Sequence, residues 1–174
     1  AFFKVNYKTQ KVEGRFDLAH CTALVKWDEH SLLVHDREEN KVKIFNLQAN
    51  QVTYPFESLV DQQGNPIDAV FSFAEKIAEN RYLLTTTNSG MYIFDKAQNK
   101  IYHYTHNVSD ISSLANNVTT KIQVGHNGWV FVGCNPNGIS YFNVHNVISN
   151  QITFIDAQGR GYDGLIEGIA TRDN

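Results

Sequence analysis

Short runs in which apolar and polar residues alternate follow one another along the chain, and one phenylalanine-centred run returns three times. The segment VKIFN at 42–46 recurs as MYIFD at 91–95 and as ISYFN at 139–143, and a weaker copy, FFK, stands at 2–4. The central phenylalanines, separated by 49 and 48 residues, are Phe45, Phe94 and Phe142. Alternation with a period of two predicts half-buried strands. A repeat at this spacing indicates a stacked or circular repeat fold.

Each repeat contains further β-prone runs in the same order. An opening run stands at 21–27, 68–73 and 118–124, and a fourth follows at 165–171. A second run contains the residue 12 positions before each central phenylalanine, namely Leu33, Tyr82 and Val130. A last run begins or is centred at Val52, Ile101 and Ile152. Together these runs predict four short strands in every repeat.

Helix is hard to fit to this pattern. The two best helical windows, 74–79 and 109–116, are too short to stand alone and fall between strand signals, so we predict a turn and a loop there. Asn-Gly pairs at 127–128 and 137–138, and Asn-Ser-Gly at 88–90, supply the positive φ angles that tight hairpins need.

Four short antiparallel strands that return at a nearly constant interval are typical of a β-propeller, in which one small sheet per repeat packs face to face around an axis. A β-sandwich of duplicated hairpins is the alternative, but it has no reason to reset its whole strand pattern at one interval. We predict an all-β fold, with residues 1–174 forming part of a single β-propeller domain. Its parts are the end of a preceding blade at 1–15, three complete four-stranded blades at 16–54, 55–104 and 105–155, and the start of a following blade at 156–174.

Composition and charge narrow the possible partners. The 174 residues are one domain's worth of chain, with 42% hydrophobic residues and a net charge of −3. This balance lacks the basic excess that attracts nucleic acid, so we expect no nucleic-acid partner. No apolar run approaches the length of a bilayer span, and both ends look cut from a longer chain. Cys21 and Cys134 show no zinc or redox spacing and are predicted to be free thiols.

The third repeat carries a resemblance to a known family. It reads SSLANNVTTKI at 112–122, HNGWVFVGC at 126–134 and NGISYF at 137–142. This order resembles the two-component regulator propeller repeat, which runs as Ser-Leu, a polar spacer, Val-Thr-x-Ile, an acidic turn, Leu-Trp-Ile-Gly-Thr and Gly-Leu-x-x-Phe-Asp. The second repeat matches at 88–95 and the first mostly by spacing. Positions that are Trp in the family are occupied here by Val34, Leu83 and Phe131.

The resemblance implies a role in signalling. Such repeats build the extracytoplasmic sensors of hybrid two-component regulators in Bacteroides-type gut bacteria, which detect oligosaccharides. By this likeness the chain is a fragment of the periplasmic sensing propeller of an inner-membrane histidine kinase, and its partners are an oligosaccharide and the remainder of the parent sensor chain. An incomplete ring also leaves two sheet faces uncovered, so we expect self-association through them.

No motif in the sequence points to catalysis. The Asp and Glu residues are scattered through turns, and no nucleophile elbow, phosphate loop or His-Glu-x-x-His is present. The close pair His103 and His106 would point to opposite faces of a strand, so we expect no metal and no cofactor. A protein-interaction propeller is the alternative function, followed by a propeller glycoside hydrolase or lyase.

Ligand binding is predicted on loops at one rim. The loops between the second and third strands and the connections 55–67, 105–117 and 156–164 are expected to share that rim. Trp27 and Trp129 suit stacking on sugars, but Trp129 follows a turn at the opposite rim, where an aromatic ring seals the edge of a sheet. The candidate ligand-binding residues, chosen for hydrogen bonding or stacking, are Asn88, His106, Asn135, Asn137, Arg160, Tyr162 and Asp163.

Overall fold

The computed structural model describes residues 2–18, 20–56, 58–136 and 138–152, together with 158 and 168–170. These residues form β-strands, turns and one short 3-10 helix at His126–Gly128. The protein is therefore all-β, as the alternating pattern predicts. The predicted loop at 109–116 is also confirmed.

Twelve of the strands form three antiparallel sheets of four strands, which we call blades 1, 2 and 3. Blade 1 consists of β3 (Cys21–Lys26), β4 (Ser31–Asp36), β5 (Lys41–Asn46) and β6 (Gln51–Thr53). Blade 2 consists of β7 (Phe71–Ala78), β8 (Arg81–Thr86), β9 (Met91–Asp95) and β10 (Lys100–Tyr104). Blade 3 consists of β11 (Thr119–Val124), β12 (Trp129–Cys134), β13 (Gly138–Asn143) and β14 (Asn146–Ile152). A hairpin of β1 (Phe2–Asn6) and β2 (Lys11–Phe16) precedes blade 1.

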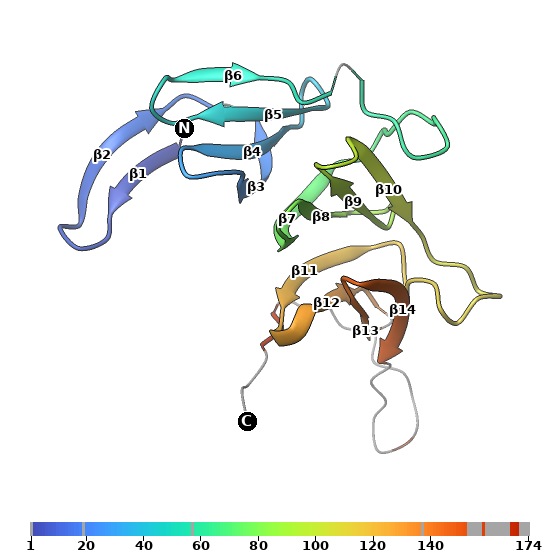
Figure 1. Ribbon diagram of the computed structural model, residues 1–174. Coiled ribbons are helices and arrows are strands. Elements are labelled where there is room, and N and C mark those ends of the chain that lie inside the picture. Colours follow the sequence, from blue (N-terminus) through green and yellow to red (C-terminus); the bar gives the residue numbers. More distant parts are fainter. Residues whose placement is uncertain are drawn as a thin grey trace.

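The three blades follow an arc around a common centre (Figure 1). The first strands of neighbouring blades contact one another, β3 with β7 and β7 with β11. Strand order within each blade is the order along the chain, so the first strand is innermost and the fourth outermost. This arrangement is that of consecutive propeller blades.

The three repeated phenylalanines occupy equivalent places. Each lies in the third strand of its blade, is at most 4% exposed, and faces the preceding element of the arc. Phe45 packs edge-on against Phe16 of the hairpin, with ring centroids 5.2 Å apart. Phe94 stacks with Trp27 of blade 1 at 5.7 Å. Phe142 belongs to a buried cluster with Leu83 and other residues of blade 2. The repeated phenylalanine therefore encodes the same contact in each blade, namely that with the preceding element of the arc.

The register of blade 1 differs from that of blades 2 and 3 by one residue. Phe94 pairs with Tyr82 and Phe142 with Val130, as the spacing of 12 suggests. Phe45, however, pairs with Leu32 and not with Leu33. The cause is the turn between the second and third strands, which joins Asp36 to Lys41 through four residues in blade 1 but Cys134 to Gly138 through three in blade 3. Because side chains alternate between faces, this change of one residue in pairing places Leu33 on the opposite face from Phe45.

The turn predicted at 74–79 is wrong. Residues Phe71–Ala78 form β7, the longest described strand, and the chain turns only after it. Its side chains pack on both sides, with Ala74 in the cluster shared with blade 1 and Ile77 in the cluster shared with blade 3. Burial between two blades thus overrides the helical preference of this alanine-containing segment.

Two further expectations concern the ends of the chain and its cysteines. Of the predicted following blade at 156–174, with its opening run at 165–171, only Gln158 and residues 168–170 are described, and none of these is in a strand. The rest lies outside the described residues. Both cysteines are free, Cys134 buried and Cys21 half-buried.

Candidate functional site

The loops between the second and third strands of blades 1 and 2 lie beside the connections 55–67 and 105–117, as predicted, and we call this side the loop rim. Apart from Gln158, the predicted connection 156–164 lies outside the described residues. In blade 1 the Asn40 side-chain amide donates to the Ile67 carbonyl at 3.1 Å. In blade 2 the backbone N–H of Gly90 donates to the Asn117 carbonyl at 2.8 Å. In blade 3 the backbone N–H of Asn135 donates to the Val118 carbonyl at 2.9 Å.

Three of the predicted ligand-binding residues are described, and they adjoin one short segment of this rim. His106 donates its backbone N–H to the Asn117 side chain at 2.7 Å. Asn88 lies two residues before Gly90, which bonds to the Asn117 carbonyl, and Asn135 bonds to Val118. The structure therefore brings their neighbourhoods together at 117–118. Asn137, Arg160, Tyr162 and Asp163 lie outside the described residues.

These three residues differ in how free their side chains are. Asn88 is exposed, and its side-chain oxygen accepts a hydrogen bond from the Ser89 hydroxyl at 3.0 Å. Asn135 is half-buried. The Nδ1 atom of His106 lies 2.6 Å from the Leu114 carbonyl oxygen, so this ring closes the base of the 105–117 loop. His106 is thus a loop-positioning residue, and Asn88 is the better placed to meet a ligand.

The 105–117 loop also carries two apolar residues that the sequence analysis did not single out. Val108 is 87% exposed and Ile111 is 90% exposed. The loop around them is held by its own hydrogen bonds, from Ser109 N–H to Asn107 and from Ser112 N–H to Asp110. Loop positions that expose apolar side chains on a fixed backbone are suited to contact with another protein.

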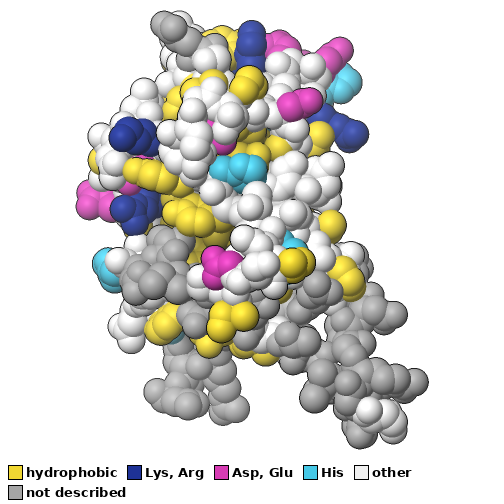
Figure 2. All heavy atoms as spheres, turned by 90° about the vertical axis from the view of Figure 1, so that its right-hand side faces the viewer, with side chains coloured by type: hydrophobic (Ala, Val, Ile, Leu, Met, Phe, Trp, Pro, Cys, Tyr) yellow, Lys and Arg dark blue, Asp and Glu magenta, His cyan; other side chains and the backbone are white. Residues whose placement is uncertain are grey.

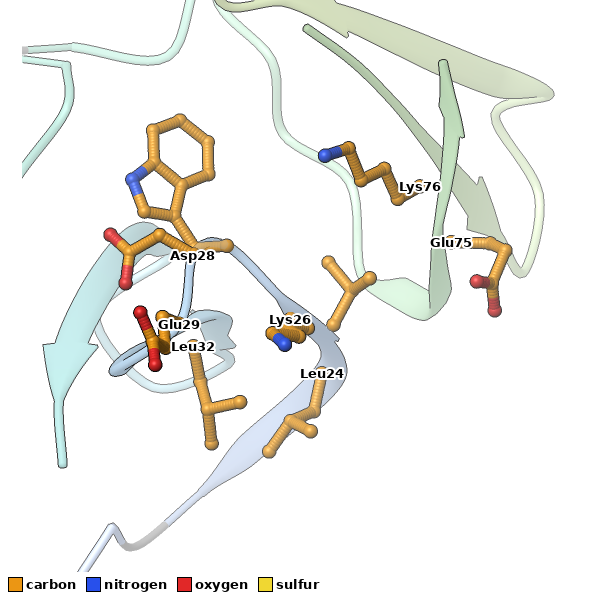
Figure 3. A pocket seen from close by; sticks show the side chains of 9 residues that line it. Leu24, Lys26, Asp28, Glu29, Leu32, Glu75 and Lys76 are labelled. Carbon is orange, nitrogen blue, oxygen red and sulfur yellow. The ribbon is translucent and has the colours of Figure 1, made fainter. Parts of the chain in front are cut away.

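A hollow of about 750 Å³ lies at the inner strands of blades 1 and 2, away from the predicted residues. Figure 3 shows the side chains of Lys26, Asp28 and Glu29 on one side and that of Lys76 on the other, with the Glu75 carboxylate turned away from them. Leu24 and Leu32 add apolar surface. Sequence reasoning missed this hollow because it searched the loops, whereas exposed Lys26 and Glu75 project from central strands. Their polar side chains among apolar neighbours were the available signal.

Trp27, which borders the hollow, is not an open platform for a sugar. Its ring stacks on Tyr82 at 4.9 Å, and the Lys96 ammonium lies 4.1 Å from the ring centroid. The Tyr82 hydroxyl donates to the Trp27 carbonyl at 2.9 Å. Trp27 therefore seals the junction of blades 1 and 2. Trp129 lies beside Tyr141 on blade 3 and is 40% exposed.

Ionisation in the hollow favours binding over proton transfer. The backbone N–H of His30 donates to the Asp28 carboxylate at 2.9 Å, and this hydrogen bond is the main cause that lowers the pKa of Asp28. A carboxylate with a lowered pKa is a hydrogen-bond acceptor at neutral pH and a poor general acid.

The histidine pair has no shared ligand position. His103 stacks on Tyr92 with ring centroids 4.2 Å apart, and its Nε2 lies 2.7 Å from the Ser89 carbonyl oxygen. His106 bonds to Leu114 instead. Within the described part of the chain, no three His, Cys, Asp or Glu side chains gather as metal ligands. Nor do these residues contain a helix of the length and hydropathy that a bilayer crossing requires.

The charges are mixed over the surface. Figure 2 shows Lys and Arg interspersed with Asp and Glu on the side turned to the viewer, with apolar side chains between them. No broad field of one sign covers this face, in agreement with the small net charge of −3.

Comparison with protein-family models and with curated protein sequences finds no match. Solved structures do match. The extracellular domain of a protein assigned as a one-component system of Bacteroides thetaiotaomicron aligns with 87% of this chain and 19% of its own, with a TM-score of 0.63 and 16% identity. That of a protein assigned as a hybrid two-component system of the same organism aligns with 76% of this chain and 18% of its own, with a TM-score of 0.58 and 12% identity.

A third similar structure is smaller. The computationally designed protein Ika4 aligns with 93% of this chain and 84% of its own, with a TM-score of 0.57 and 11% identity. The chain thus spans less than a fifth of the two bacterial domains but most of the designed protein. Taken with the equivalent blades, these comparisons show that the chain has the propeller-blade fold found in extracellular domains of Bacteroides thetaiotaomicron regulatory systems.

Proposed function

We propose that this chain is part of the extracytoplasmic sensor of a hybrid two-component histidine kinase, and that it binds an oligosaccharide without converting it. The proposal places the chain on the periplasmic side of an inner-membrane protein, with the rest of the sensor as its covalent partner. The likeness of its blades to extracellular domains of bacterial regulatory systems supports this role. So does the resemblance of its third repeat, at 112–142, to the two-component regulator repeat.

The hollow at the inner strands is the observation that carries the ligand proposal. Sugars are held by hydrogen bonds to their hydroxyls and by apolar contact with their C–H faces. Lys26 and Lys76 supply donors from different blades, Asp28 supplies an acceptor, and Leu24 and Leu32 supply apolar surface. A volume of about 750 Å³ suits a short oligosaccharide, since ligand sites measure about 300–1,000 Å³.

The arrangement of carboxylates supports binding without cleavage. Glycoside hydrolysis uses two carboxyl groups, one of which has a raised pKa so that it can protonate the leaving oxygen. The carboxylates of the hollow are Asp28, Glu29 and Glu75, and the pKa of Asp28 is lowered. Signalling would then follow from unequal binding of the sugar to two arrangements of the sensor.

Calorimetry with a panel of host and dietary oligosaccharides tests the proposal. We expect at least one sugar to bind and to be recovered unchanged by chromatography. Lys26→Ala and Lys76→Ala should each weaken binding about tenfold or more, since a lost hydrogen bond to a charged group costs about 1.5–3 kcal/mol. Lys8→Ala, at an exposed lysine in the turn of the β1–β2 hairpin, is the matched control. Release of shorter sugars, or binding that survives both variants in the hollow, would contradict the proposal.

A protein-interaction propeller is the second candidate, and the exposure of Val108 and Ile111 favours it. Under this alternative the chain docks a partner subunit through the 105–117 loop and binds no sugar. In a pull-down with this chain as bait, a Val108→Ser, Ile111→Ser double variant would then fail to capture the partner subunit. Lys26→Ala would still capture it.

A further inference from the structure

The register defines which positions of a blade face the next blade. Opposed pairs of the second and third strands are Leu33 with Ile44 in blade 1 and Leu83 with Ile93 in blade 2. Leu33 and Leu83 are fully buried, each in the cluster that joins its blade to the following one. We call this side of each sheet its forward face and the side with the anchor phenylalanine its backward face.

The forward face of blade 3 has the same character, and none of the described blades packs against it. Its corresponding pair is Phe131 with Tyr141, whose ring centroids lie 6.0 Å apart. Trp129, on the same face, is 5.9 Å from the Tyr141 ring and 40% exposed. Phe131 and Tyr141 are only half-buried, whereas Leu83 and Ile93, their counterparts, are at most 2% exposed. Three aromatic side chains thus stand where a blade contact is made elsewhere.

The hairpin at the other end of the arc presents the complementary side. Phe2 pairs with Phe16, which packs on blade 1, so Phe3 and Val5 point away from blade 1. Phe3 is 58% exposed, Val5 53%, and Val12, which pairs with Val5, 61%. Phe3 precedes Phe45 by 42 residues and is the residue of the weaker repeat copy that corresponds to the anchor phenylalanine. It is an anchor phenylalanine on an uncovered backward face.

We propose that copies of this chain associate head to tail, with the forward face of blade 3 in one copy covering the backward face of the β1–β2 hairpin in the next. The chain already makes this forward-to-backward contact inside itself, between blades 1 and 2 and between blades 2 and 3. The new contact continues the same series. It joins the two ends of the arc in Figure 1, and the net charge of −3 offers little repulsion between copies.

The same reasoning excludes a face-to-face dimer of two blade 3 sheets as the primary contact. That dimer would pair two forward faces, a combination that none of the junctions between the described blades uses, and would leave Phe3 and Val12 in water. A head-to-tail contact uses different surfaces on the two copies, so it either closes into a ring or extends. The inference concerns assembly of the 174-residue chain and does not depend on the sugar ligand. In a longer parent sensor, adjoining blades would make the same forward-to-backward contacts in place of a second copy.

Light scattering coupled to size-exclusion chromatography tests the proposal with the whole 174-residue chain. We expect a dimer or larger species at micromolar concentration. Phe131→Asp and Phe3→Asp should each give a monomer. Mixing the two variants should restore a dimer that cannot grow, because the intact Phe3 face of one copy meets the intact blade 3 face of the other.

Controls separate this contact from misfolding and from other apolar surfaces. A Val108→Asp, Ile111→Asp variant changes two more exposed residues on the 105–117 loop and should assemble as the unchanged chain does. Circular dichroism should show that each variant keeps its β-structure, and Val12→Asp serves as the second hairpin variant. A monomeric unchanged chain, or a Phe3→Asp variant that still dimerises by itself, would overturn the proposal.

Discussion

At the scale of single residues, His35 shows how a polar group is kept inside the arc. It is fully buried in blade 1, where Nδ1 lies 2.9 Å from the Thr22 hydroxyl and Nε2 lies 3.1 Å from the Asn40 side-chain oxygen. Its ring meets Phe71 of blade 2 edge-on, with centroids 4.8 Å apart. Asn40 in turn donates to the Ile67 carbonyl. The histidine is therefore held within blade 1 through both ring nitrogens and contacts blade 2 through the Phe71 ring.

We predict that His35 makes the fold sensitive to mild acid. Burial lowers the pKa of His35 in the folded chain, while the unfolded chain takes up the proton near its usual value of about 6.5. The contribution of neutral, buried His35 to the free energy of unfolding is therefore complete above about pH 6.5. It declines as pH falls from there through the lowered pKa of the folded chain. Urea unfolding between pH 7.5 and 5 measures it. His35→Gln should flatten this dependence, and an unchanged slope in that variant would contradict the assignment.

The buried ion pair of Lys43 and Asp36 gives a second prediction at this scale. Lys43 Nζ lies 2.6 Å from Asp36 Oδ2 and 3.1 Å from a Glu39 carboxylate oxygen, and both Lys43 and Asp36 are 8% exposed. Lys43→Met should lower the free energy of unfolding by about 3–5 kcal/mol, because it leaves a buried carboxylate without its partner. The exposed Lys41→Met is the control and should change it by less than about 1 kcal/mol. Equal losses in the two variants would show that burial does not matter here.

At the scale of elements, the turn between β8 and β9 joins blade 2 to the start of blade 3 at the loop rim. Gly90 has a φ angle of +76°, and a Cβ there would collide with the Tyr104 carbonyl oxygen. Its N–H bonds to the Asn117 carbonyl, and its carbonyl accepts from the Thr86 and Thr119 hydroxyls at 2.7 and 2.6 Å. The turn can therefore hold only a residue without a side chain.

Replacing this glycine should destabilise the chain more than replacing a glycine of similar backbone shape. Gly64 has a φ angle of +85°, but a Cβ there meets nothing within 4 Å. Both Gly→Ala changes carry the strain of a positive φ, roughly 1–2 kcal/mol, and Gly90→Ala adds a backbone clash. Thermal unfolding of the two variants measures the difference. Equal melting temperatures would mean that the turn relaxes freely.

At the scale of the whole molecule, burial is greatest in the middle of the arc. Blade 2 is packed on both sides, and every residue of β9 is buried. Among the described elements, the hairpin packs only against blade 1 and blade 3 only against blade 2. In a row of repeats that touch only their neighbours, stability is close to a sum of repeat and interface terms.

Hydrogen exchange should therefore be slowest in β8 and β9 and fastest in β1 and β2. Opening of an end unit breaks one interface, whereas opening of blade 2 breaks two. Mass spectrometry after exchange for minutes to hours measures this order. At concentrations at which copies associate, protection of β1 and β13 should rise together. Protection that is uniform along the chain would show that the arc opens only as one unit.

Much of the fold was predictable from the sequence, because residues that are close together along the chain encode the contact between blades. A phenylalanine flanked by alternating apolar residues, with glycine-containing turns, specifies strand, face and turn at once. The sequence misjudged residues 74–79, because Ala74 and Ile77 become strand residues only when blades 1 and 3 cover them. Nor does hydrophobicity show whether Leu32 or Leu33 pairs with Phe45, since pairing depends on the length of a turn.

The candidate site was less predictable, since a rim can be inferred from strand order but a hollow cannot. Alternation by itself determined that Phe45, Phe94 and Phe142 are core residues and that loops gather on one side. The tertiary structure alone decided that His106 holds its own loop and that Lys26 and Glu75 border one hollow. The physical reason is range: side-chain alternation acts between neighbours along the chain, whereas a binding surface is made where residues from different blades meet.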